Sequence, residues 1–161
     1  MRCFKFRGRL FYGRLLAKQM FNAAAESGII RNASVIIPIP MHPLKKLRRG
    51  YNQAEVLAKE LSKLSGVPYA NALQKLTFSG AQHDLGMLER TGNVAATFEV
   101  KRKYTPLIEN ANVILVDDIM TTHATLNEAA KTLLIFGADS VNALAAAAAP
   151  KKKTAPEDRK L

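Results

Sequence analysis

The stretch "NVILVDD", residues 112–118, constrains the fold of this chain more than any other feature. It is an apolar run without polar alternation, and it ends in two adjacent carboxylates. Such a run is typical of a central strand that helices cover on both faces. We therefore predict a strand over residues 112–118, with Asp117 and Asp118 at its carboxyl end.

A helix and a second strand are predicted directly after this run. Apolar residues recur at helical spacing at Leu126, Ala129, Ala130, Leu133 and Leu134. Thr125 and Glu128 form a capping-box pattern and Gly137 is a stop signal, which predicts a helix over 125–136. "SVNALAAAA", 140–148, then predicts a strand, so the order indicates a right-handed βαβ unit with a parallel sheet.

The earlier part of the chain supplies further elements. Apolar residues at helical spacing, Phe11 with Leu15 and Leu16 with Met20, predict a helix over 10–26 that contains Gly13. "SVIIPIP", 34–40, predicts a buried strand that its prolines end near Ile37.

A third helix is expected in "YNQAEVLAKELSKL", with Asn52 as N-cap, Glu55 as its capping-box partner and Leu61 on the buried face. Residues 66–93 hold four glycines and no sustained period, so we expect a loop with short elements there.

Size and composition restrict the class of protein. A chain of 161 residues fits one domain, which would bury roughly 70% of its unfolded surface. No apolar run approaches the ~20 residues of a membrane span, and the N-terminus lacks a signal-peptide pattern. The single cysteine, Cys3, suits a reducing compartment. We therefore expect a cytoplasmic protein.

The positive charge lies mostly in the first third of the chain. Residues 1–54 hold eleven Lys or Arg and one acid, so they carry ten of the eleven net charges. Aromatic residues, among them Phe4, Phe6 and Phe21, stand between these charges and could stack on the bases of a single-stranded nucleic acid. The alternative is a solvated helix face whose aromatic residues point into the core.

The acids and the threonines after them predict a ligand site. Ligands bind outside the carboxyl ends of parallel strands, and carboxylates suit sugar hydroxyls or a hydrated Mg²⁺. Thr121, Thr122 and Thr125 stand where the first turn of a helix leaves backbone N–H groups free to bind a phosphate. The alternative is that Thr125 only caps the helix and the acids only end the strand.

An apolar strand ending in Asp also occurs in P-loop nucleotide hydrolases, which require G-x-x-x-x-G-K-[ST]. The nearest string, "GRLFYGRL", residues 8–15, lacks the lysine and the hydroxyl, and no apolar strand precedes it. This class is excluded.

"VILVDDIMTTHATL" resembles the phosphoribosyl-pyrophosphate loop of type I phosphoribosyltransferases. "VIIPIPMHPLKKLRRGYNQAEVLAKEL" and "AQHDLGMLERTGNVAATFEV" are similar to segments of the ComF competence family within that superfamily. The resemblance implies an α/β fold, with a central, mainly parallel sheet flanked by helices and a mobile loop over the site. It divides the chain into a basic helical segment, 1–30, the phosphoribosyltransferase-like domain, 31–150, and a disordered basic tail, 151–161.

The resemblance also assigns roles to residues. Asp117 and Asp118 would accept hydrogen bonds from the ribose hydroxyls, and the catalytic set would be these two acids and Arg90. Gln82 and Arg90 would lie in the mobile loop, residues 77–93. The 5′-phosphate and the pyrophosphate of the ligand would be held by Thr121, Thr122, His123, Ala124, Thr125, Met41, His42, Pro43 and Arg49. Mg²⁺ would be bound through the pyrophosphate of the ligand, with no direct protein ligands.

The family implies a function in natural competence, the uptake of single-stranded DNA, possible partners being that DNA and the uptake helicase machinery. The resemblance allows two interpretations of the function: an enzyme that transfers the phosphoribosyl group, or a catalytically silent regulatory or DNA-interacting module. Two departures favour the second interpretation. The family's four-cysteine zinc ribbon is lacking, which indicates a naturally short member or a truncated frame, and His123 replaces a glycine. Glycine would allow positive φ or close approach to the phosphate.

Overall fold

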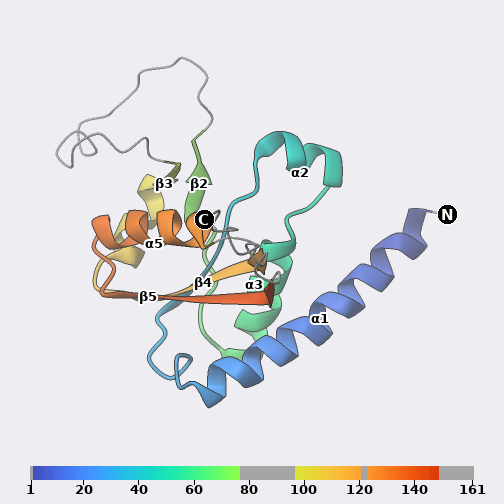
Figure 1. The fold of residues 1–161 in the computed structure, drawn as a ribbon, viewed down its shortest axis with the longest axis horizontal. Helices are drawn as coiled ribbons and strands as arrows, with labels where there is room; N and C mark the ends of the chain where they lie inside the picture. Colours follow the sequence, from blue (N-terminus) through green and yellow to red (C-terminus); the bar gives the residue numbers. More distant parts are fainter. Residues whose placement is uncertain (1, 77–96, 121–122, 149–161) are drawn as a thin grey trace, which may run out of the picture.

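The computed structural model describes residues 2–76, 97–120 and 123–148, with side chains from residue 13 onward (Figure 1). Its centre is a parallel sheet of three strands in the order β1-β4-β5. The strands are β1 (Val35–Pro38), β4 (Asn112–Met120) and β5 (Ser140–Ala148). Helix α5 (Ala124–Ile135) connects β4 to β5. The predicted β–helix–β order and its parallel pairing are therefore confirmed, and β4 continues two residues past the predicted end.

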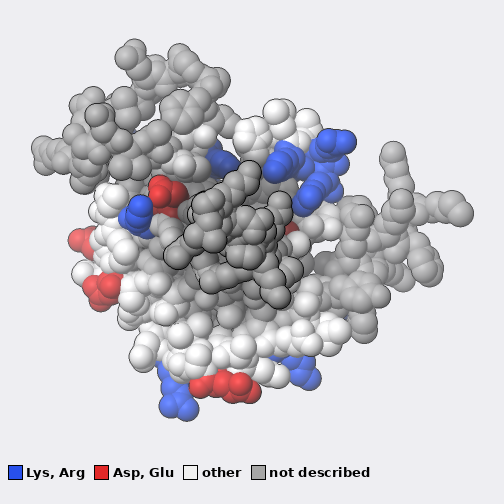
Figure 2. All heavy atoms as spheres, viewed as in Figure 1, with Lys and Arg blue, Asp and Glu red and all other residues white. Residues whose placement is uncertain are grey.

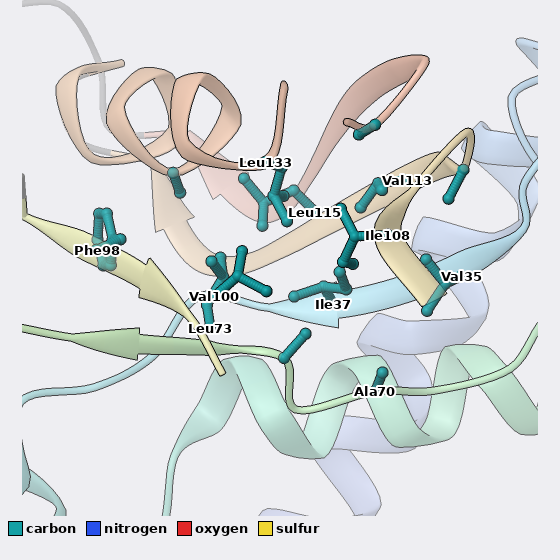
Figure 3. Close-up of a cluster of buried hydrophobic side chains, with 14 of the residues drawn as sticks. Val35, Ile37, Ala70, Leu73, Phe98, Val100, Ile108, Val113, Leu115 and Leu133 are labelled. Carbon is teal, nitrogen blue, oxygen red and sulfur yellow. The ribbon is translucent and has the colours of Figure 1, made fainter. Parts of the chain in front are cut away.

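Side chains of the central strands alternate between two apolar layers. Val35, Ile37, Val113 and Leu115 face one layer, which α5 and the short strands β2 (Leu73–Lys75) and β3 (Phe98–Val100) complete (Figure 3). All four are fully buried. This burial on both faces is the physical reason for the unbroken apolar run in the sequence.

The opposite face of the sheet packs against α3 (Gln53–Ser65) and α1 (Arg2–Glu26). Ile36, Ile114 and Val116 point to this side. In Figure 1 the long helix α1 runs beside α3, and it contacts both α3 and β5. Two helices on one face and α5 on the other give the expected α/β layering.

Helix α1 begins eight residues before the predicted start. Leu15 and Leu16 are 50% and 37% exposed, whereas Ala17 and Met20 are buried. A Cβ added at Gly13 would lie 3.3 Å from Val56 Cγ1 on α3. Small residues therefore face α3, because they let the two helices approach closely.

Short elements complete the fold. They are α2 (Pro43–Arg49), the antiparallel pair β2–β3, the 3-10 turn η2 (Arg102–Tyr104) and α4 (Thr105–Ile108). Strand β2 lies in the stretch 66–93, where short elements were expected, and the others were not predicted. Helix α2 has no buried residue, so it carries no periodic burial pattern for sequence reasoning to detect. No helix in the described ranges is both long and apolar enough to span a bilayer.

The helix ends test the predicted caps. Asn52 caps α3 as predicted, but the Glu55 carboxylate bonds Lys59 and Lys46 instead of closing a capping box. The N-cap of α5 is His123, so the prediction that Thr125 caps this helix was wrong. Gly137, with φ +93°, follows the end of α5 and confirms the predicted stop.

Candidate functional site

The carboxyl ends of β1 and β4 meet at one edge of the sheet. Pro38 of β1 pairs with Val116 of β4, and the N–H of Ile39 donates to the Val116 carbonyl at 2.8 Å. We call residues 39–42, which leave β1 at this point, the β1 loop. It therefore starts beside Asp117 and Asp118, which follow Val116 directly. The structure brings these two predicted parts of the site together although about 75 residues separate them in the sequence.

The two acids are adjacent and lie near the carboxyl end of strand β4. Asp117 pairs with Ala145 of β5, whereas Asp118 has no partner in the register of the two strands. Met120, two residues further on, packs with the layer that contains Val113 and Leu115. The N–H of Asp118 donates to Asp117 Oδ1 at 2.8 Å, and the N–H of Ile119 donates to Asp118 Oδ1 at 2.9 Å. These backbone bonds orient both carboxylates before any ligand arrives.

Asp117 is the electrostatically unusual member of the pair. Its partial burial raises its pKa from the usual value to about 6, against the opposing effect of the Asp118 N–H bond. The adjacent Asp118 carboxylate adds to the rise. A carboxylate kept ionised at neutral pH in this setting favours ligand groups that donate hydrogen bonds, such as sugar hydroxyls.

Three residues lie between the end of β4 and the start of α5, so the amino end of α5 lies at the same edge of the sheet. Ala124 and Thr125 occupy the first turn and are exposed. The N–H groups of a first turn have no partner within the helix, and the helix dipole adds partial positive charge there. The anion site that the sequence predicted would lie at this end of α5.

His123 has an ordinary right-handed backbone, with φ −67° and ψ −7°. Its side chain is exposed and makes no capping hydrogen bond. Of the two reasons considered for a glycine here, positive φ and close approach to a phosphate, the described backbone does not require the first. The remaining difference between glycine and histidine at this position is steric, because the imidazole occupies volume next to the first turn of α5.

The β1 loop carries Met41 and His42, both partly exposed, as the sequence analysis expected. His42 Nδ1 accepts the N–H of Leu44 at 3.3 Å, so this side chain caps α2. Pro43 is already the first residue of that helix. Arg49, at the far end of α2, donates to Gln53 Oε1 at 3.0 Å and lines a hollow with Arg48 and Tyr51. No described contact joins Arg49 to the acids.

Several predicted site residues lie outside the described residues. These are Thr121, Thr122, Gln82 and Arg90, together with the whole segment 77–93. Their assignments remain predictions from the resemblance.

Helix α2 is a surface feature that sequence reasoning missed. Its four charged residues are all basic, and Figure 2 shows blue side chains gathered where Figure 1 places α2. Leu44 and Leu47 on the same helix are 70% and 84% exposed. The signal in the sequence was the string "PLKKLRRG", which has a proline at the helix start and a glycine at its end.

Among the described residues, no group of three or more His, Cys, Asp or Glu lies close enough together to hold a metal ion. Two carboxylates near the amino end of a helix do suit Mg²⁺, which usually keeps its waters and binds through one or two carboxylates and substrate phosphates. The donor set therefore fits a cation that arrives with a phosphorylated ligand.

Fold and sequence comparisons define the class of protein. The family described as "Phosphoribosyl transferase domain" matches residues 22–160, so the chain belongs to this family, and its relatives place it in the ComF-type branch. A purine phosphoribosyltransferase from Pyrococcus horikoshii superposes with a TM-score of 0.53 at 17% identity, covering 88% of this chain and 79% of that one. That level of identity shows a shared fold.

The curated relatives are proteins of competence and DNA use. "Competence protein F" of Haemophilus influenzae is 32% identical over 86% of this chain. "DNA utilization protein YhgH" of Escherichia coli strain K12 is 27% identical over 80% of it. The chain spans 62% and 55% of the lengths of these two relatives.

Proposed function

We propose that this protein binds phosphoribosyl pyrophosphate with Mg²⁺ at the carboxyl edge of its sheet and acts in natural competence. The observation that carries the proposal is the meeting of Asp117 and Asp118 with the β1 loop and the first turn of α5. These groups match the three parts of the ligand: ribose hydroxyls, pyrophosphate and 5′-phosphate.

Each part of the site has a physical role in this proposal. Asp117 and Asp118 accept hydrogen bonds from the ribose, and the first turn of α5 binds the 5′-phosphate through backbone N–H groups. The β1 loop holds the pyrophosphate, and Mg²⁺, when bound with the ligand, neutralises the charge of that leaving group. Departure of pyrophosphate leaves positive charge on the sugar, so catalysis depends on positioning and electrostatics and needs no side-chain nucleophile.

Titration calorimetry with phosphoribosyl pyrophosphate, in the presence and absence of Mg²⁺, tests the proposal. We expect saturable, Mg²⁺-dependent binding, and an assay for pyrophosphate release then shows whether turnover accompanies it. No binding at millimolar ligand would contradict the proposal.

The second candidate is a catalytically silent module that contacts single-stranded DNA, which the names of the relatives and the basic surface of α2 favour. Salt-dependent binding of a single-stranded oligonucleotide without ligand binding would support this candidate.

Replacing His123 by glycine is expected to strengthen ligand binding, because it removes the imidazole beside the phosphate-binding turn. The fold should tolerate the change: glycine is an acceptable N-cap, and the His123 side chain makes no capping bond to lose. We expect the midpoint of thermal unfolding to change by only a few degrees. Calorimetry on His123→Gly that gives equal or weaker affinity would show that the histidine does not hinder the site.

A further inference from the structure

Asn52 is one of two polar side chains that the structure buries within its described ranges; the other is Thr132. Thr132 bonds the carbonyl one turn earlier in its own helix. Asn52 instead reaches out of its helix to another segment. Burying an amide is costly unless both its donor and its acceptor form hydrogen bonds. The Asn52 amide forms one of these bonds with a second segment, so it does more than cap its own helix.

The two ends of the Asn52 amide make different contacts. Oδ1 accepts the N–H of Ala54 at 3.2 Å, which caps α3. Nδ2 donates to the carbonyl of Ile39 at 2.9 Å, across thirteen positions of the chain. Capping needs only the acceptor, and Ser, Thr or Asp would supply it equally well. The second bond needs the amide donor, which those three residues cannot place there.

Ile39 is the first residue of the β1 loop, and both of its backbone polar groups are held. Its N–H donates to the carbonyl of Val116, the residue before Asp117, and its C=O accepts from Asn52. Ile39 is itself buried. The start of the β1 loop is thus fixed on one side to the strand that carries the acids and on the other side to the start of α3.

We propose that Asn52 is a positioning residue: through Ile39 it holds the β1 loop at a set distance from Asp117 and Asp118. The proposal rests on the proposed function, because the β1 loop is assigned to the pyrophosphate and the acids to the ribose. A ligand that must touch both parts binds well only when their separation is correct before binding.

Three variants separate positioning from capping. Asn52→Ser keeps a capping acceptor but loses the donor to Ile39. Asn52→Asp keeps the acceptor and the size, but turns a carboxylate oxygen toward the Ile39 carbonyl. Asn22→Ser, at an exposed position on α1, is the matched control. Affinity for phosphoribosyl pyrophosphate with Mg²⁺ is measured by calorimetry at 25 °C, and amide hydrogen exchange is followed in residues 39–46 and in α3.

We expect the affinity to fall about tenfold in Asn52→Ser and further in Asn52→Asp, with Asn22→Ser equal to the wild type. Amides of the β1 loop should exchange faster in both Asn52 variants while α3 keeps its protection. A role limited to capping predicts instead that Ser and Asp match the wild type in affinity and loop exchange, and that result would overturn the proposal. Loss of protection throughout α3 would also overturn it, because the effect would then be that of a damaged helix.

The exchange measurement distinguishes this proposal from the proposed function. If the wild-type protein binds no ligand, the proposed function fails. Amide hydrogen exchange of the β1 loop in Asn52→Ser still tests whether Asn52 positions this loop. Faster exchange confined to residues 39–46 supports the positioning role, and unchanged exchange contradicts it.

Discussion

Replacing Asp117 by asparagine is expected to weaken ligand binding and, at neutral pH, to stabilise the free protein. The carboxylate is assigned to a ribose hydroxyl, and a hydrogen bond to a charged group contributes about 1.5–3 kcal/mol. The dissociation constant for phosphoribosyl pyrophosphate should therefore rise about 10- to 100-fold in calorimetry. Unchanged affinity would remove Asp117 from the proposed site.

The stability effect follows from the raised pKa of Asp117. The folded state raises this pKa from 3.8 to about 6, so folding is favoured by protonation of the group. That favourable contribution is fully present below pH 4 and is lost as the pH rises through 6. At pH 7.5 the ionised Asp117 therefore destabilises the fold, by about 1 kcal/mol once solvent screening of this partly exposed group is allowed for.

Urea unfolding of the wild type and Asp117→Asn, at several pH values between 4 and 8, measures this effect. The variant should be more stable at pH 7.5, and the difference should shrink toward pH 4. Asp139→Asn, at an exposed position before β5, is the control and should change stability by less than about 0.5 kcal/mol. A difference between Asp117→Asn and wild type that is independent of pH would contradict the assigned burial. This measurement needs no ligand, so it stands apart from the proposed function.

Replacing Leu61 by alanine is expected to produce the largest loss of stability. Leu61 lies on α3, is 0% exposed, and packs in the layer between α3 and the sheet with Ile36 and Ile114. Removing a buried leucine side chain costs the transfer free energy of the lost atoms and leaves a cavity, together about 2–5 kcal/mol. Urea unfolding should show a lower midpoint with an unchanged slope.

Leu64→Ala is the matched control for this variant. Leu64 lies one turn further along α3 and is 46% exposed, and the substitution is chemically the same. We expect a loss of less than about 1 kcal/mol for it. Equal losses in the two variants would mean that helix propensity, which the substitutions change alike, and not burial against the sheet, determines the contribution of these residues.

Local sequence patterns were sufficient where an element is buried or clearly bounded. The unbroken apolar run before Asp117 predicted a central strand, and it lies between two layers as expected. The helical periodicity of apolar residues in α3 predicted that Leu61 is buried, and it is. The predicted stop, Gly137, follows the end of α5 with a positive φ. In each case the pattern depends on neighbours within a few positions, which the sequence displays directly.

The local pattern was least informative where distant contacts decide the packing. The apolar spacing that includes Leu15 and Leu16 predicted a helix, but it did not show which face of α1 is buried. Ala17 and Gly13 face α3, since small residues allow close helix packing, and Leu15 and Leu16 are exposed. Helix α2 was missed because it buries no side chain. Thr125 fitted a capping box, yet α5 begins at Ala124 and its N-cap is His123.

The sequence by itself determined the chemistry of the candidate site: two acids, the start of a helix after them, and a loop after an earlier strand, all visible as short strings. Only the tertiary structure decided how these parts are joined. Ile39 is bonded to Val116 and to Asn52, three residues widely separated along the chain. Such bonds depend on which strands pair and where a helix begins in space, and they leave no periodic signature in the sequence. The relative position of the β1 loop and the acids is therefore a property of the folded sheet.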